Sequence, residues 1–236
     1  MRNWIIFNGK SLKDFGVYIS GAGTYNAAER DVEEVVVPGR NGVLTLDNGR
    51  YKTTPLTYPA FIIRGLKDNI SALRNWLLAQ KGFVRLEDTY HPDEYRLARF
   101  KGEFLAEANE ELDAANFELT FDVYPQRFLK EGERVYTFSA AGTLRNETLM
   151  NAKPLIRAYG TGYFTIGGKK ITISTASSYT DIDCDLQEAY KDTMATNCNG
   201  NIVLNDGVFP VLTPGDNAIT ISGLSKIEIT PRWWIL

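Results

Sequence analysis

"FELTFDVYPQRFLKEGER", residues 117–134, separates two series of predicted β-strands. Its first seven residues are rich in the aromatic and β-branched types that favour strands. Pro125 ends this strand, and the charged segment that follows contains a Gly and shows no clear period. We therefore predict a boundary here, with a first domain at residues 1–130 and a second at residues 131–236.

The first half of the chain consists mainly of short predicted strands. Runs rich in Val, Ile, Phe, Tyr and Thr alternate with "NGK", "PGRNG", "DNGR" and "HPDE", which supply the Gly, Asn and Pro of tight turns. The strands are expected at residues 4–7, 17–20, 32–37, 43–46, 56–64, 83–88, 95–104 and 117–123.

One segment of the first half predicts a helix. In "DNISALRNWLLAQKG", residues 68–82, apolar side chains that include Ile70, Leu73 and Trp76 recur at intervals of three or four. An Asp or Asn cap precedes them and a Gly follows. We predict an amphipathic helix over about residues 69–80 that covers one face of a sheet, with Trp76 in the core.

The second half contains a second series of closely spaced strands with almost no helix. Its turns include "GGKK", "NCNGN" and "TPGDN". This pattern favours a second β-sandwich or jelly roll, so the fold class is mainly β. The strands are expected at residues 135–138, 154–159, 163–166, 171–174, 179–185, 201–204, 217–221 and 227–230.

Composition and charge narrow the class of protein. The 236 residues carry 26 Lys and Arg against 29 Asp and Glu, interleaved along the chain, for a formal net charge of −3. No basic footprint for nucleic acid and no polybasic membrane anchor is present in this balance. The apolar start "MRNWIIF" is too short for a signal-peptide core or a membrane span. We expect a soluble chain made in the cytoplasm, with no nucleic-acid contact and no membrane partner.

The sequence offers no catalytic cluster. His91 is the single histidine, and it lies in a polar turn before Pro92. Neither Cys184 nor Cys198 has the context of a nucleophile, and three scattered Cys and His residues do not make a zinc site. A glycosidase needs only two carboxylates, but no pair stands out among the 29. We therefore expect no enzyme, no catalytic residue and no cofactor, and a disulfide between the two cysteines is disfavoured.

"DIDCD", residues 181–185, superficially resembles the start of a calcium loop. The positions that would need Gly and Glu are filled by Leu186 and Asp192, which disfavours metal. Strand alternation is the better interpretation: Ile182, Cys184 and Leu186 would face inward and the three aspartates would face water. We expect no metal site.

The chain ends in "IEITPRWWIL", residues 227–236, with two of its four tryptophans. A loose tail would expose their apolar area, so we expect Trp233 and Trp234 to close the second domain as a final strand at an edge or bend set by Pro231. Arg232 could lie over an aromatic face. The competing interpretation makes the outward Trp234 a sugar-stacking platform, with Tyr179 as a second candidate.

The order of features along the whole chain resembles the distal tail protein family of long-tailed phages of Gram-positive bacteria. In the first half the resemblance rests on four segments. They are "FNGKSLKDFGVYIS" (7–20), "VPGRNGVLTLDNG" (37–49), "LRNWLLAQKGFVRLEDTYHPDEYRLARF" (73–100) and "FDVYPQRFLKEGE" (121–133). In the second half it rests on "KPLIRAYGTGYFTIGGKKITI" (153–173), "YTDIDCDLQEAY" (179–190), "FPVLTPGDNAI" (209–219) and the C-terminal segment.

The resemblance implies a structural role at the tail tip of a virion. Family members form a six-subunit ring from N-terminal domains that are each a β-sandwich with a helix. Galectin-like or carbohydrate-module-like C-terminal β-sandwiches project outward. The implied partners are five further copies of the chain, the major tail tube protein, and a tail-associated, baseplate or receptor-binding protein. The implied function is tail assembly and host adsorption.

Candidate contact residues can be named for such a ring. The hairpin of about residues 83–104 could be an extended arm whose tip supplies Tyr90, His91, Asp93 and Tyr95 to a neighbour. It could equally be an internal hairpin with a solvent-exposed turn. The alternative function, from a different class, is a monomeric cell-wall carbohydrate-binding protein with a saccharide as partner. A cell-wall hydrolase is the third hypothesis.

Overall fold

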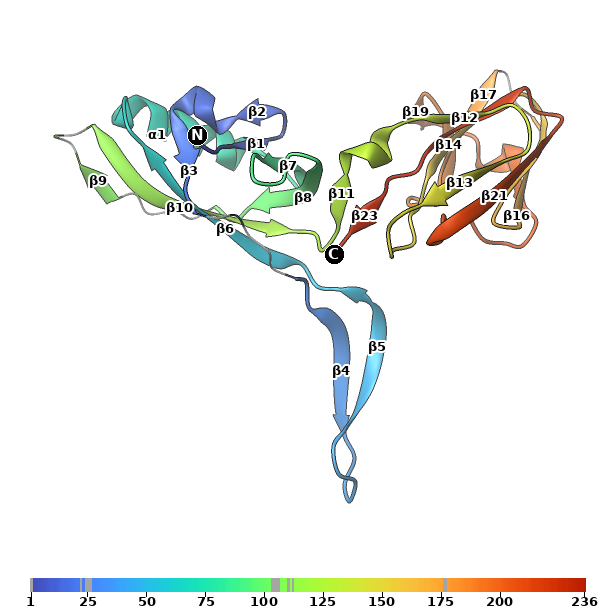
Figure 1. The fold of residues 1–236 in the computed structure, drawn as a ribbon, viewed down its shortest axis with the longest axis horizontal. Coiled ribbons are helices and arrows are strands. Elements are labelled where there is room, and N and C mark those ends of the chain that lie inside the picture. Colours follow the sequence, from blue (N-terminus) through green and yellow to red (C-terminus); the bar gives the residue numbers. More distant parts are fainter. Residues whose placement is uncertain are drawn as a thin grey trace. The chain divides into compact units, whose positions relative to one another are not determined.

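The computed structural model describes residues 2–21, 23, 27–102, 107–109, 111, 113–175 and 178–236 (Figure 1). The chain divides into two compact units: Met1–Arg127 with Leu236, and Phe128–Ile235. This division lies close to the predicted boundary after residue 130. Across the described residues the chain is mainly β with one α-helix, which confirms the predicted fold class.

The described residues of the first unit form one sheet, one α-helix and one separate strand pair. In the sheet the strand order is β2-β1-β7-β8-β10-β6-β3, and β9 pairs with the first residues of β10. The elements are β1 (Ile5–Phe7), β2 (Lys10–Ser11), a 3₁₀ helix (Leu12–Phe15), β3 (Val17–Ile19), β4 (Arg30–Val36), β5 (Val43–Tyr51), β6 (Thr54–Ile62), α1 (Leu66–Ala79), β7 (Val84–Asp88), β8 (Glu94–Phe100), β9 (Glu107–Asn109) and β10 (Ala114–Val123).

This sheet curls until its two ends meet. Asn3, just before β1, forms an antiparallel bridge with Ile19 of β3, and the Ile19 amide donates to the Asn3 carbonyl at 2.8 Å. Strand twist accumulated over the sheet makes such curling possible. One face of the sheet is thereby turned inward around a shared core.

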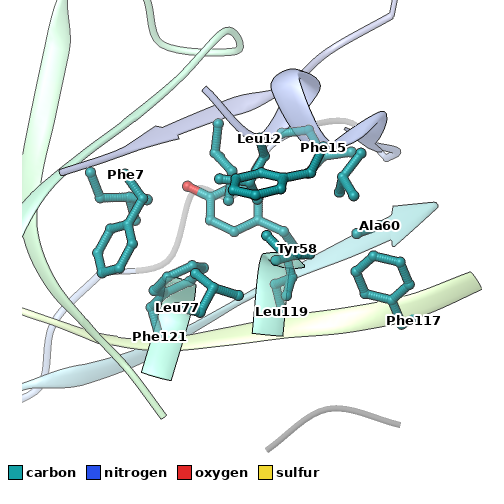
Figure 2. Close-up of a cluster of buried hydrophobic side chains, with 14 of the residues drawn as sticks. Phe7, Leu12, Phe15, Tyr58, Ala60, Leu77, Phe117, Leu119 and Phe121 are labelled. Carbon is teal, nitrogen blue, oxygen red and sulfur yellow. The ribbon is translucent and has the colours of Figure 1, made fainter. Parts of the chain in front are cut away.

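The core of the first unit combines aliphatic side chains with a group of contacting aromatic rings (Figure 2). Phe7 contacts Phe121 and Trp76 edge to face, with ring centroids 5.0 and 5.8 Å apart. Leu73 and Leu77 of α1 are buried against the same cluster. Trp76 is partly buried on it, so the predicted amphipathic helix does cover the sheet through this face.

Helix α1 begins at Leu66, earlier than the predicted start at about residue 69. Its N-cap residue Gly65 has a left-handed φ of 68° and no side chain to cap the helix. The carboxylate of Asp113 accepts hydrogen bonds from the amides of Gly65 (2.5 Å) and Leu66 (2.9 Å) instead. The cap comes from a residue far along the chain, which local sequence signals do not reveal.

The second unit is a sandwich of two antiparallel sheets. The six-stranded sheet has the order β12-β22-β14-β17-β18-β19, and the five-stranded sheet has the order β13-β21-β15-β16-β20. The strands of the two sheets are β12 (Tyr136–Phe138), β13 (Gly142–Asn146), β14 (Leu155–Tyr159), β15 (Gly162–Ile166), β16 (Lys169–Ile173), β17 (Tyr179–Asp183), β18 (Glu188–Lys191), β19 (Thr193–Asn197), β20 (Ile202–Leu204), β21 (Gly215–Ser222) and β22 (Lys226–Thr230). Two short strands, β11 (Arg127–Leu129) and β23 (Trp234–Ile235), lie outside these sheets. The 3₁₀ helices are Lys130–Glu133 and Asn199–Asn201.

The terminal tryptophans are fixed to this unit. Trp233 is buried in its core at 5% exposure, and Trp234 is partly buried against it. Strand β23 pairs with the connector strand β11, and the Leu129 amide donates to the Trp233 carbonyl at 2.8 Å. Pro231 precedes a left-handed Arg232, with φ of 58°, so the chain bends before this short strand.

The predicted orientation of residues 181–186 is wrong in two respects. Asp181 and Asp183 are buried at 2% and 3% exposure, whereas Leu186 is 49% exposed. Strand β17 is internal to the sheet, and arginines from elsewhere cover its outer face: Arg157 binds Asp181 at 2.6 and 2.9 Å. Arg232 binds Asp183 rather than lying over an aromatic ring. Strand alternation predicts the faces but not what covers them.

Candidate assembly surface

Strands β4 and β5 form a hairpin that pairs with no other strand in the described ranges of the chain. The segment "PGRNG", residues 38–42, connects them, as the sequence predicts. Figure 1 shows this hairpin continuing beyond β6 as a two-stranded ribbon separate from the sheet of the first unit. We call residues 29–52 the arm.

The arm exposes aliphatic side chains on both of its faces. The register pairs Val35 with Leu44 and Val36 with Val43, so these two pairs lie on opposite faces. An isolated two-stranded ribbon has no other element packed on it that could bury either of its faces. The exposed aliphatic residues near the tip are Val36 (75%), Val37 (38%), Val43 (44%), Leu44 (40%) and Leu46 (49%). Exposed apolar side chains gathered in this way are typical of interaction surfaces, so the arm is a candidate for one.

Charged pairs connect the two strands at the base of the arm. Arg30 binds Asp47 at 2.5 Å, and Arg50 binds Asp31 at 2.6 Å. A hydrogen bond from the Gly49 amide, followed by the one from Arg30, lowers the pKa of Asp47. Exposed pairs add little stability, but they fix which residues of the two strands stand opposite one another.

Sequence reasoning did not single out the arm. The sequence predicts both of its strands, but the candidate ring contact that it suggests lies on the hairpin of residues 83–104. The available signal was the run of three valines at residues 35–37. Consecutive aliphatic residues point to both faces of a strand, whereas a strand with one buried face alternates apolar and polar residues.

The predicted contact hairpin, β7 and β8, lies inside the sheet between β1 and β10. Tyr90 packs partly buried on the core, and its hydroxyl is buried with no hydrogen-bond partner among the described residues. His91 and Tyr95 are half-buried, and the Arg85 guanidinium lies 3.9 Å from the centroid of the Tyr95 ring. Asp93 is exposed. A role in ring contacts stays a prediction for these four residues, and three of them also contribute to the fold.

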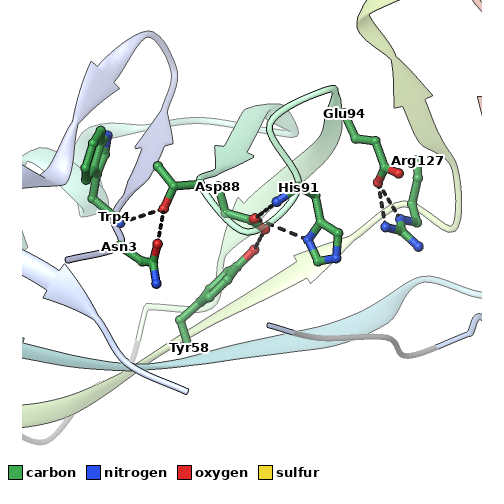
Figure 3. Close-up of polar contacts among 8 residues, drawn as sticks. Asn3, Trp4, Tyr58, Asp88, His91, Glu94 and Arg127 are labelled. Atoms are coloured by element: carbon green, nitrogen blue, oxygen red, sulfur yellow. Dashed lines mark hydrogen bonds and ion pairs between the residues drawn. The ribbon is translucent and has the colours of Figure 1, made fainter. Parts of the chain in front are cut away.

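Asp88 organises the turn of this hairpin (Figure 3). Its carboxylate accepts hydrogen bonds from the Tyr58 hydroxyl at 2.7 Å and the His91 amide at 2.8 Å, and the His91 Nδ1 lies 3.2 Å away. Burial, followed by the charge of Asp88, raises the pKa of Tyr58, which keeps the hydroxyl a donor. Beside the turn Arg127 binds Glu94 at 2.6 Å. The single histidine therefore serves to shape this turn.

The two candidate sugar-stacking residues are not brought together. Trp234 donates its Nε1–H to the carbonyl of Asn151, which precedes β14, at 2.9 Å. Tyr179 stands opposite Tyr159, at the other end of β14. The Tyr179 hydroxyl is hydrogen-bonded to Asp192, and the Arg157 guanidinium covers its ring at 4.3 Å. Sugar stacking stays a prediction for both residues, with most of the polar and aromatic surface of Tyr179 already in use.

The described residues contain no group of three or more His, Cys, Asp or Glu side chains that could hold a metal ion. Both cysteines are free thiols. In the same part of the chain, no helix has the length and hydropathy required to cross a bilayer.

Comparison by sequence finds no match, either to a family model or to a curated protein. Comparison by structure does. The chain is similar to the crystal structure of SPP1 Dit (gp 19.1), a hub adsorption apparatus protein of phages that infect Gram-positive bacteria, with a TM-score of 0.76. The likeness covers 100% of both chains at 14% sequence identity. The two proteins share one fold from end to end. The resemblance expected from the order of sequence features is thus present in the backbone of both units.

Proposed function

We propose that this chain is a non-enzymatic structural protein of a phage tail tip. It forms a six-membered ring that joins the tail tube protein to a baseplate or receptor-binding protein during tail assembly and host adsorption. The observation that carries this proposal is the full-length structural likeness to the SPP1 Dit hub protein. A likeness confined to one unit would fit many β-sandwich proteins, whereas two units in the same order are far more restrictive.

The arm supports self-assembly. Its two faces expose Val36 with Val43, and Leu44 with Leu46, and no described part of the chain buries them. In a closed ring each subunit uses one patch to meet a different patch on its neighbour. A ribbon with two apolar faces suits such a contact, because it can insert against a neighbour and become buried on both sides.

The absence of turnover is part of the proposal. The single histidine is engaged with Asp88, and Cys184 is buried. Burial, followed by the charge of Asp183, raises the pKa of Cys184 to about 12, which keeps the thiol protonated and unreactive. A scaffold requires surfaces that contact its neighbours, and the exposed aliphatic side chains of the arm offer one.

The test is the mass of the protein in solution, measured by light scattering after size exclusion at several concentrations. The expected mass of the ring is about 159 kDa, six times the 26.5 kDa of one chain. The double variant Val36→Lys with Leu44→Lys places one charge on each face of the arm. We expect it to abolish the ring while the circular dichroism spectrum and the unfolding temperature stay unchanged, because neither residue belongs to the core.

Val203→Lys is the matched control. Val203 is 53% exposed on the edge strand β20 of the second unit, so its exposure resembles that of the arm residues. This variant should keep the wild-type mass. A mass of one chain at all concentrations, also after addition of a tail tube protein, would contradict the ring. It would favour the monomeric carbohydrate-binding alternative.

A further inference from the structure

The six-stranded sheet of the second unit carries three tyrosines on the face opposite its core. Tyr190 pairs with Asp181 across β17 and β18, and its neighbour Ala189 is buried in the core. Tyr179, two residues before Asp181, and its cross-strand partner Tyr159 lie on the same outer face. Aromatic side chains on an outer sheet face offer flat apolar area to a ligand wherever their own ring faces are unoccupied.

Two of these tyrosines, Tyr159 and Tyr179, already have their rings and hydroxyl groups in contact with charged side chains. The Tyr159 hydroxyl donates to Glu228 at 3.0 Å, and the Lys226 ammonium lies 4.4 Å from its ring centroid. Tyr179 is covered by Arg157 in the same way. Both rings therefore belong to charged networks that stabilise the sheet.

Tyr190 differs from them. Within the part of the chain that the structure describes, its side chain makes no hydrogen bond, aromatic ring contact or cation–π contact, although the charges of Arg232 and Arg157 act on its hydroxyl. Burial, followed by the charges of Asp183 and Asp181, raises the pKa of Tyr190, so its hydroxyl remains a donor. It lines an open hollow of about 410 Å³, a volume within the range of small-molecule sites. The hollow is lined by Leu186, Glu188, Tyr190, Met194 and Asn197.

Asn199 holds the polar side chains of the hollow in place. The Asn199 side-chain Nδ2–H donates to Glu188 Oε2 at 2.7 Å, and the Asn199 backbone N–H donates to Asn197 Oδ1 at 2.8 Å. Its own Oδ1 accepts from the Ala189 amide at 2.6 Å. Because the Asn197 oxygen is used, the Nδ2 of that residue remains a donor, and one Glu188 oxygen remains an acceptor.

We propose that this hollow binds a neutral pyranose sugar, with the C–H face of the ring on Tyr190 and hydroxyl groups bonded to Glu188 and Asn197. Leu186 and Met194, exposed at 49% and 67%, extend the apolar surface beside Tyr190. The site lies within the second unit alone, so it does not depend on ring formation.

Charge decides between neutral and anionic saccharides. Glu188 is the charged residue that lines the hollow, and no Lys or Arg lines it. A phosphodiester or uronate polymer would place its negative charge against this carboxylate, which is unfavourable. A neutral sugar uses the same carboxylate as a hydrogen-bond acceptor.

The experiment is saturation-transfer NMR on the full chain. The probes are the methyl glycosides of glucose, galactose, rhamnose and N-acetylglucosamine, with glycerol 3-phosphate as the anionic comparison. We expect transfer to the ring protons of at least one neutral glycoside and none to glycerol phosphate. Tyr190→Ala should weaken binding about tenfold or more, the loss of a principal contact. Asn197→Asp, which replaces the amide donor by a carboxylate, should also weaken it.

Two variants control for the loss of a surface tyrosine. Tyr163→Ala removes a tyrosine from the five-stranded sheet, and Tyr179→Ala removes the sequence-predicted candidate. Both should keep wild-type binding, and unfolding temperatures verify that every variant is folded. Absence of transfer to all neutral probes would overturn the proposal, as would full binding by folded Tyr190→Ala. Loss of binding in Tyr179→Ala alone would return the site to Tyr179. None of these outcomes bears on the mass of the ring.

Discussion

The guanidinium of Arg232 donates two hydrogen bonds, of 2.7 and 2.8 Å, to the carboxylate of Asp183. The amides of Asp185 and Leu186 donate to the same carboxylate at 3.0 and 3.1 Å. Asp183 is 3% exposed, so this carboxylate is nearly removed from water. The hydrogen bonds from Arg232 and the two amides keep it charged, because they lower its pKa against the effect of burial. The pair connects the last bend of the chain to the internal strand β17, and it explains why the terminal tryptophans are held in place.

Replacing Arg232 by Met should destabilise the second unit by about 2 kcal/mol or more, because a buried carboxylate would lose its cation. Urea unfolding followed by tryptophan fluorescence measures this, since Trp233 is adjacent and buried. Arg145→Met is the matched control, because the partners of Arg145, Glu147 and Asp216, are exposed. An equal effect of the two substitutions would show that the Arg232 pair contributes no more than a surface pair.

The same pair predicts a pH dependence. Burial acts to raise the pKa of Asp183, but the hydrogen bonds from Arg232 and the two amides outweigh it and lower the pKa. The unfolded chain therefore takes up this proton at a higher pH, about 3.9, than the folded chain does. The stabilisation is complete above that pH and is lost as the pH falls through the folded pKa.

Asp183→Asn removes this titration. The difference in unfolding temperature between wild type and Asp183→Asn should be smaller at pH 3 than at pH 7, because the stabilisation decreases as the pH falls below the pKa of the unfolded carboxyl. A difference that stays constant between the two pH values would exclude Asp183 as a source of acid sensitivity.

These contacts show what the sequence could predict. The strands that contain Phe121 and Ile229 can be predicted from their local composition. Both residues are buried in a core, as their apolar side chains indicate. The burial of Asp183 does not follow, because its partner is 49 residues away and no local rule pairs them. The strands β18 and β19 were also missed, since neither "EAYK" nor "TMATN" has the composition of a strand.

The start of helix α1 also depends on a residue distant in the sequence, Asp113, and this gives a further prediction. Asp113→Ala should remove the acceptor for the Gly65 and Leu66 amides and fray the first turn of α1. Hydrogen exchange of the amides in Leu66–Asn69 should become faster, while exchange at Leu73 and Leu77 stays slow because those residues are buried. Asp68→Ala is the control, since Asp68 lies in the same first turn but does not cap it. Equal exchange in both variants would refute capping by Asp113.

Thiol labelling tests the chemistry assigned to Cys184. With the thiol buried and its pKa raised to about 12, iodoacetamide at pH 8 should leave Cys184 unmodified in the folded protein. Both cysteines should react in urea, because both are free. Mass spectrometry of the labelled peptides separates Cys184 from Cys198. Rapid modification of Cys184 without denaturant would contradict its burial.

The candidate surfaces were harder to predict than the fold. A sequence shows which residues are apolar, but exposure depends on whether a second layer covers them. Val36 and Val43 have the composition of core residues and are exposed because the arm has no such layer. Tyr190 and Tyr179 both lie on the outer face of a strand. They differ because the Arg157 guanidinium covers the ring of Tyr179, whereas no cation among the described residues covers that of Tyr190.

The close packing of Gly132 against the terminal segment gives a prediction about how the C-terminus is held. A Cβ added at Gly132 would overlap the backbone nitrogen of Trp233, which cannot move without disrupting β23. The Gly132 carbonyl also accepts the Arg232 amide at 2.8 Å, so the connector and the terminal segment approach closely. Gly132→Ala should therefore lower the unfolding temperature and make residues after Pro231 accessible to carboxypeptidase. Gly200→Ala is the matched control, because no atom lies within 4 Å of its added Cβ. Wild-type resistance of Gly132→Ala to carboxypeptidase would show that the terminal segment is held by Arg232 and Trp233 alone.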